Sequence, residues 1–172
     1  MPKLERLEWV APLTEGRGVT LTDDPEADMF LAENPNALLL GVLYDSQYQT
    51  RRAFAIPLML RGRLNHLEMM RLAAERDAVQ QAFVAKPALH RFPNRFARLT
   101  SDLAEVVSRE YSGDAGRIWL EAPSPDVLAE RLMTLPAFGP AKTDWTVGML
   151  GRLGVLRFDG WDGFRIREKV SG

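Results

Sequence analysis

The pattern of apolar and polar positions along the chain predicts helices separated by short breaks. Residues 37–44 are apolar on every side, which is typical of a helix that is buried all round, and we expect this helix to be the centre of the fold. A buried strand is the competing interpretation of such a run. The chain has few other strand-like segments that could pair with it, so the pattern favours a helix.

Capping residues and helical spacing predict further helices around this centre. Thr22-Asp23-Asp24-Pro25 is typical of a helix start, and Ser112 to Gly116 is a clear break. Residues 1–22 are expected to be an irregular lead-in. The remaining helices are predicted over residues 26–33, 51–60, 67–76, 78–84 and 99–111. The chain is therefore predicted to be all-α, with residues 1–172 forming a single domain.

Residues 124–153 predict two helices joined by a tight hairpin. Ser124 is a suitable N-cap, and Pro125 follows at the first helical position, where its missing N–H costs nothing. An apolar stripe then runs through Val127, Leu128, Leu132 and Leu135. Pro136 is expected to end this helix, and Gly139 to turn the backbone where a Cβ would clash.

The second helix of this pair is predicted to begin at Pro140, with Ala141, Trp145, Met149 and Leu153 near one face. A hairpin of this length leaves the first N–H groups of the second helix convergent. With the positive end of the helix dipole, these donors suit a phosphate. The alternative is a plain connection in which Pro and Gly only punctuate the chain.

Composition excludes several classes of site. The chain has no cysteine, so disulfides, thiolate zinc sites and iron–sulfur clusters are excluded. His66 and His90 are too far apart in sequence to suggest a metal site, and both are expected at the surface. No apolar run approaches the ~18 residues of a membrane span, and nothing at the start is similar to a signal peptide. We therefore expect no membrane association and a cytoplasmic location.

Charge is distributed unevenly along the chain. The overall net charge is −1, but the first 34 residues hold eight of the 23 acidic residues and three of the 22 basic ones. The rest therefore carries 19 basic and 15 acidic residues, a net charge of +4. Residues 86–95 form a basic, aromatic loop that includes Arg91. This asymmetry permits a nucleic-acid partner, although a compositional bias toward arginine explains it equally well.

The hairpin Leu135-Pro136-Ala137-Phe138-Gly139 resembles the helix-hairpin-helix of the endonuclease III class of DNA glycosylases, which reads Leu-Pro-x-x-Gly before a second helix. Residues 39–47 are similar to the second recurring segment of that superfamily, an apolar helix ending in a small-polar-Gln corner. The resemblance implies a two-lobed α-helical fold that binds double-stranded DNA across the cleft between its lobes, as a monomer. It also implies a monovalent cation held by hairpin backbone carbonyls as the only candidate cofactor.

The resemblance also implies roles for particular residues. Gln47 would enter the duplex where a nucleotide has been extruded, and Tyr48 would offer a stacking face beside it. A polar corner that merely caps a buried helix is the alternative. The remaining DNA contacts are expected from the loop and from the hairpin with the start of its second helix, at Arg91, Phe138, Gly139, Ala141 and Lys142.

The catalytic assignment follows from spacing within the resemblance. Asp159 lies eighteen positions after Ala141, the interval that separates the family's lysine position from its catalytic aspartate. The alternative interpretation is that Asp159, which Gly160 follows directly, is a turn residue. Ala141 occupies the place of the family's lysine nucleophile. Lys142 comes one residue later, which rotates its side chain by ~100°, so we expect it to contact phosphate.

The resemblance therefore implies a monofunctional DNA glycosylase that hydrolyses the N-glycosidic bond of a damaged or mispaired base after base flipping. Without a lysine nucleophile, cleavage of the DNA strand is not expected. Two alternatives stay open. One is a DNA-binding module that has lost catalysis, and the other is a helical protein-interaction domain.

Overall fold

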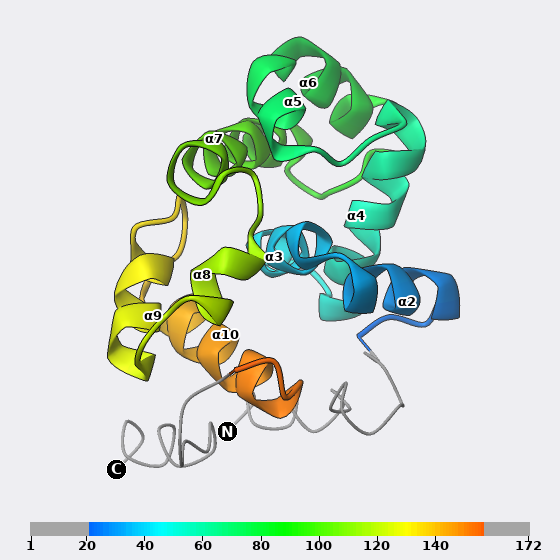
Figure 1. Cartoon of the computed structure of the whole chain (residues 1–172). Coiled ribbons are helices and arrows are strands. Elements are labelled where there is room, and N and C mark those ends of the chain that lie inside the picture. Colours follow the sequence, from blue (N-terminus) through cyan, green and yellow to red (C-terminus); the bar gives the residue numbers. More distant parts are fainter. Residues whose placement is uncertain (1–20, 157–172) are drawn as a thin grey trace.

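The computed structural model describes residues 21–156, and within that range it is built from helices with no strand (Figure 1). The all-α prediction is thus confirmed for this part of the chain. The helices are α2 (Pro25–Glu33), α3 (Pro35–Tyr44), α4 (Thr50–Leu64), α5 (Met69–Ala74), α6 (Arg76–Val84), α7 (Pro93–Tyr111), α8 (Gly116–Leu120), α9 (Pro125–Met133) and α10 (Pro140–Arg152). None of these helices is long and apolar enough to cross a bilayer.

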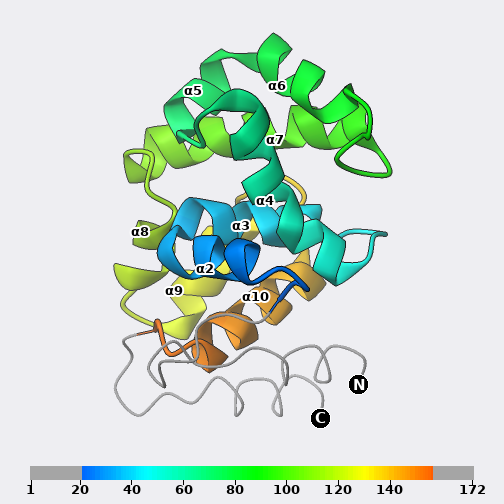
Figure 2. The ribbon, with the colours of Figure 1, turned by 90° about the vertical axis from the view of Figure 1, so that its right-hand side faces the viewer.

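Helix α3 lies at the centre of the arrangement, as its sequence predicts. Every residue from Ala37 to Tyr44 is buried. Helices α5, α6 and α7 pack together on one side of α3, at the top of Figures 1 and 2, and α9 and α10 lie on the other side. The Tyr44 hydroxyl reaches the Thr100 hydroxyl of α7 at 2.8 Å, and Thr100 donates to the Phe96 carbonyl at 2.6 Å, so Tyr44 is the donor in the first contact. These two hydrogen bonds join α3 to α7.

Close packing of α3 against α4 depends on Gly41. A Cβ at this position would lie 2.4 Å from Cδ1 of Phe54, whose ring is fully buried. On α4, Phe54 also lies near Trp145 of α10, with ring centroids 5.9 Å apart. The missing side chain at Gly41 therefore lets one aromatic ring contact both neighbours.

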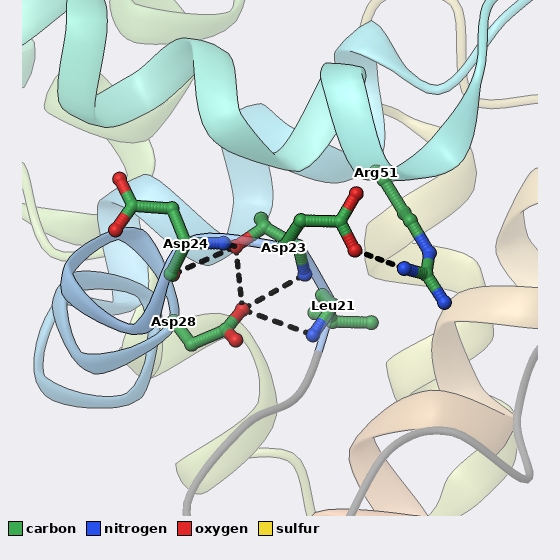
Figure 3. A network of polar contacts seen from close by, with 6 residues as sticks. Leu21, Asp23, Asp24, Asp28 and Arg51 are labelled. Carbon is green, nitrogen blue, oxygen red and sulfur yellow. Dashed lines mark hydrogen bonds and ion pairs between the residues drawn. The ribbon is translucent and has the colours of Figure 1, made fainter.

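A network of polar contacts fixes the start of α2, as Figure 3 shows. Asp28 Oδ1 accepts hydrogen bonds from the Leu21 and Thr22 backbone N–H groups at 3.0 and 2.8 Å. Within the helix start predicted from the sequence, Asp24 is the N-cap, because its side chain accepts a hydrogen bond from the Glu26 N–H. An ion pair between Asp23 and Arg51 then ties this turn to the first turn of α4.

Several helix boundaries differ from the sequence prediction, and two of them affect the hairpin and the basic loop. Helix α9 ends at Met133, before Pro136, because Thr134 and Leu135 turn back onto the carbonyls of Arg131 and Leu132. Helix α7 begins at Pro93, six residues earlier than predicted, so the last residues of the basic loop are helical. Pro93 occupies the first helical position, where a missing N–H is tolerated.

The predicted surface location of both histidines is wrong. His66 is 7% exposed and His90 is 3% exposed. Each has hydrogen bonds at both ring nitrogens, so the polar atoms are satisfied inside the protein. For His66 the partners are the Glu75 carboxylate and the Glu68 N–H.

Candidate nucleic-acid interface

The corner, residues 45–49, connects α3 to α4 and contains the predicted base-flipping residue Gln47. Gln47 is exposed and has a φ of 50°, in the left-handed region that side chains other than glycine rarely adopt. Thr50 donates to Asp45 Oδ1 at 3.1 Å, which closes the corner onto the start of α4. A strained exposed glutamine held by its surroundings is a feature that functional sites share.

Two distant basic side chains cap the end of α3 beneath this corner. Lys142 Nζ donates to the Leu43 carbonyl at 2.9 Å, and His90 Nε2 donates to the Tyr44 carbonyl at 2.9 Å. The last carbonyls of a helix have no partner within the helix, and its negative end favours the positive charge of Lys142. Lys142 and His90 therefore satisfy the end of α3 while joining α10 and the 85–92 loop to it.

His90 is fixed as a neutral imidazole by its two hydrogen bonds. Its Nδ1 accepts from the Phe92 N–H at 3.0 Å, which leaves the proton on Nε2 for the Tyr44 carbonyl. Burial lowers the pKa of His90, and the positive charges of Lys142 and Arg95 lower it further, against the opposing effect of the Tyr44 carbonyl. The imidazole thus stays uncharged at neutral pH.

Tyr48 stacks on the outer part of this arrangement. Its ring lies 4.4 Å from the His90 ring with the planes 29° apart, and the His90 ring lies 3.9 Å from Phe96. Phe96 is buried, whereas Tyr48 is half-buried. The stack therefore runs from the core of the protein to the residue next to Gln47.

Lys142 points into the corner. Its ammonium lies 2.7 Å from Ser46 Oγ and 5.6 Å from the centroid of the Phe138 ring. Ala141, one residue earlier on α10, is exposed. The two residues thus face different surroundings, as the ~100° helical rotation requires. This geometry favours a structural link for Lys142 over the phosphate contact predicted from the sequence.

The hairpin turns at a different residue from the one predicted. Ala137 has a φ of 63°, whereas Gly139 has φ and ψ of −80° and −179°, an extended conformation that any residue adopts. A Cβ at Gly139 would meet no atom within 4 Å. The predicted requirement for glycine at 139 is therefore wrong. Phe138 is only 4% exposed, so its side chain supports the hairpin from inside and is not placed to contact DNA.

The corner, the 85–92 loop and the start of α10 lie together toward the right of Figure 2. Of the predicted DNA contacts, the structure brings Gln47, Tyr48 and Lys142 into one cluster, and Arg91 directly follows His90 in it. Sequence reasoning missed His90 and Ser46. Nothing local marks His90, because the carbonyl to which it donates belongs to Tyr44, 46 residues away. Asp159 lies outside the described residues.

Elsewhere in residues 21–156, neither a metal site nor the groove between α7 and α9 involves the predicted DNA-contacting residues. No group of three or more His, Asp or Glu side chains is placed to bind a metal ion within this range. The groove has a volume of about 550 Å³. It is lined by Val106, Arg109, Glu110, Tyr111, Val127, Glu130, Arg131 and Thr134. Burial raises the pKa of Tyr111 there.

Comparison of the chain with protein-family models, with curated protein sequences and with solved structures gives no match.

Proposed function

We propose that the protein binds double-stranded DNA at the corner and acts as a monofunctional DNA glycosylase on a damaged or mispaired base. One observation carries this proposal. The corner with Gln47, the loop with Arg91 and the first turn of α10 are three segments far apart in sequence, and Lys142 and His90 hold them against the same helix end. The two segments that resemble the glycosylase superfamily are therefore in direct contact.

The arrangement of Gln47 and Tyr48 suits an enzyme that takes a nucleotide out of the stack. Such an enzyme must fill the gap and hold the remaining base. Gln47 is exposed and offers both a donor and an acceptor, and the aromatic stack holds Tyr48 beside it. Aromatic stacking on a base contributes ~1–3 kcal/mol. Gln47 would insert, and Tyr48 would stack on an exposed base.

The catalytic step is assigned to Asp159. Cleavage of an N-glycosidic bond develops oxocarbenium-like charge on the sugar, as in glycoside hydrolysis. An ionised carboxylate stabilises that charge and can accept a proton from the attacking water. Ala141 stands where the glycosylase superfamily has its lysine nucleophile, so that amine is missing. The neighbouring Lys142 ammonium is hydrogen-bonded to the Leu43 carbonyl and the Ser46 hydroxyl. The expected product is an abasic site in an unbroken strand, without an imine adduct that borohydride could trap.

The decisive experiment is release of a damaged base from a panel of lesion-containing duplexes, comparing the parent with Asp159→Asn. This variant keeps the shape of the side chain and removes its charge, so excision should fall at least ~100-fold. Binding to lesion DNA should be unchanged or tighter, because a negative charge near phosphates is lost. Full excision by a folded Asp159→Asn protein would reject this assignment, and Asp162 would be tested next.

The alternatives differ from the proposal in what they predict for the same preparations. A DNA-binding module without catalysis would bind duplexes with a steep salt dependence and release no base. A protein-interaction domain would show no salt-sensitive binding to DNA at all. A trapped covalent adduct would contradict the monofunctional mechanism and assign the nucleophile to Lys142.

A further inference from the structure

Three exposed arginines continue from the corner along the start of α7. Arg91 follows His90 in the loop, Arg95 lies in the first turn of α7, and Arg98 follows one turn later. Residues three apart on a helix share a face. The Arg95 guanidinium lies 5.8 Å from the centroid of Phe96, whose ring stacks with His90, so this arginine lies beside the stack that carries Tyr48.

These arginines differ from most of the other exposed arginines in residues 21–156, which have acidic partners. The ion pairs are Arg51–Asp23, Arg71–Glu75, Arg76–Asp102, Arg76–Glu105, Arg109–Glu110 and Arg117–Glu121. Within the same range, no ion pair joins Arg91, Arg95 or Arg98 to a carboxylate. Among residues 21–156, no carboxylate thus lies within ion-pair distance of these three guanidinium groups.

Two of these guanidinium groups are also held on aromatic rings. Arg91 lies 5.3 Å from the centroid of Phe92, and Arg95 lies 5.8 Å from that of Phe96. A guanidinium over a ring loses little hydration, and its N–H donors stay available around its edge. Such a group is partly ordered before it binds an anion, which reduces the entropy lost on binding.

We propose that Arg91, Arg95 and Arg98 form a phosphate track that binds the DNA backbone on one side of the extruded nucleotide, an inference that rests on the proposed function. The planar fork of arginine matches phosphate oxygens. The track ends before Asp102 and Glu105, which pair with Arg76.

Continuity with the corner favours DNA over an acidic protein as the partner. The Tyr48–His90–Phe96 stack joins the corner to the first turn of α7, so a duplex opened at Gln47 has its backbone beside Arg91 and Arg95. At the far end of the track, Arg98 lines a groove together with Gln80, Asn94 and the acidic side chain of Asp77. The track therefore has a defined start at the corner and a defined end along α7.

The test measures binding to a duplex with a central tetrahydrofuran abasic analogue over a range of salt concentrations. Arg95→Gln/Arg98→Gln should reduce the slope of log K against log salt by ~1.8, which corresponds to two lost phosphate contacts. The matched control is Arg109→Gln/Arg117→Gln, which removes the same charge from two exposed arginines that have acidic partners. The control should keep the parent slope.

A second measurement shortens the duplex on one side of the analogue and then on the other. The parent should lose affinity when one particular side is shortened, whereas Arg95→Gln/Arg98→Gln should respond equally to both. Equal slopes for the parent and both variants, or equal reductions in both variants, would reject the track and leave the proposed function intact. A parent protein without salt-dependent DNA binding would reject both.

Discussion

The ammonium of Lys142 lies 2.7 Å from the hydroxyl of Ser46, although 96 residues separate them in the sequence. Because Lys142 also donates to the Leu43 carbonyl, one side chain of α10 fixes both the end of α3 and the corner that follows it. The position of Gln47 therefore depends on α10, and a substitution of Lys142 should alter the conformation of the corner.

Lys142→Met removes the ammonium and keeps most of the side-chain volume. It leaves the Leu43 carbonyl and the Ser46 hydroxyl without this donor, which should lower the free energy of unfolding by ~1–3 kcal/mol. Urea unfolding measures the change. Lys86→Met is the control, since Lys86 is exposed and should change stability by less than ~0.5 kcal/mol. Equal effects of the two variants would contradict a structural role for Lys142.

Gln47→Gly tests whether the left-handed backbone at the corner is strained. Glycine adopts a φ of 50° without a steric penalty, so this variant should be as stable as the parent or more stable, by up to ~1 kcal/mol. It should nevertheless weaken the preference for an abasic-analogue duplex over an intact one, because the side chain that we propose to insert into the duplex is gone. A stable variant with unchanged preference would assign Gln47 to structure alone.

Ala137 and Gly139 give a matched pair within the hairpin. Ala137→Gly should raise the free energy of unfolding by ~0.5–1 kcal/mol, because it relieves the left-handed conformation of an alanine. Gly139→Ala should change stability little, since its backbone is extended and a Cβ has open space. Thermal unfolding of both variants provides the measurement. A larger loss at Gly139 than at Ala137 would contradict the hairpin geometry.

His90 should make stability depend on pH. Its pKa is lower in the folded protein than the ~6.5 of an unfolded histidine, so the unfolded chain binds more protons in the interval between the two values. Stability should therefore be highest above pH ~6.5 and fall as the pH is lowered through that interval. Protonated Nδ1 would also face the Phe92 N–H. Unfolding free energies between pH ~5 and ~8 should show a smaller pH dependence in His90→Gln.

Gly41→Ala should damage the core. The added methyl group would lie 2.4 Å from the ring of Phe54, which is enclosed and also lies near Trp145. Overpacking of this kind costs ~1–3 kcal/mol. Denaturant unfolding and near-UV circular dichroism should both report it. Gly62→Ala is the control, because its Cβ would meet no atom within 4 Å.

Local signals predicted much of the helical framework. The caps at Asp24 and Ser124 accept hydrogen bonds from the second or third helical residue, as short-range rules require. Complete burial of α3 was also predicted, because a run that is apolar on all sides has no face to expose. Such features depend on residues within a few positions of one another.

Long-range features of the candidate site could not be read in the same way. The burial of His90 depends on Tyr44 and Phe96 packing around it, and no local pattern distinguishes it from a surface histidine. The direction of Lys142 depends on where α10 lies relative to α3. The turn at Ala137 was missed because glycine at 139 was a more obvious turn residue than alanine, although the tertiary structure imposes the left-handed conformation on the alanine.

The two basic caps on α3 also affect the order in which the protein can assemble. One is supplied 46 residues after the carbonyl that it binds and the other 99 residues after. Contacts between distant residues close large loops, so they form after local helices do. During synthesis, α3 must therefore wait for both the 85–92 loop and α10 before its end is satisfied. The corner with Gln47 then acquires its fixed shape only when most of the described helices are in place, so a nascent or truncated chain would lack a formed corner.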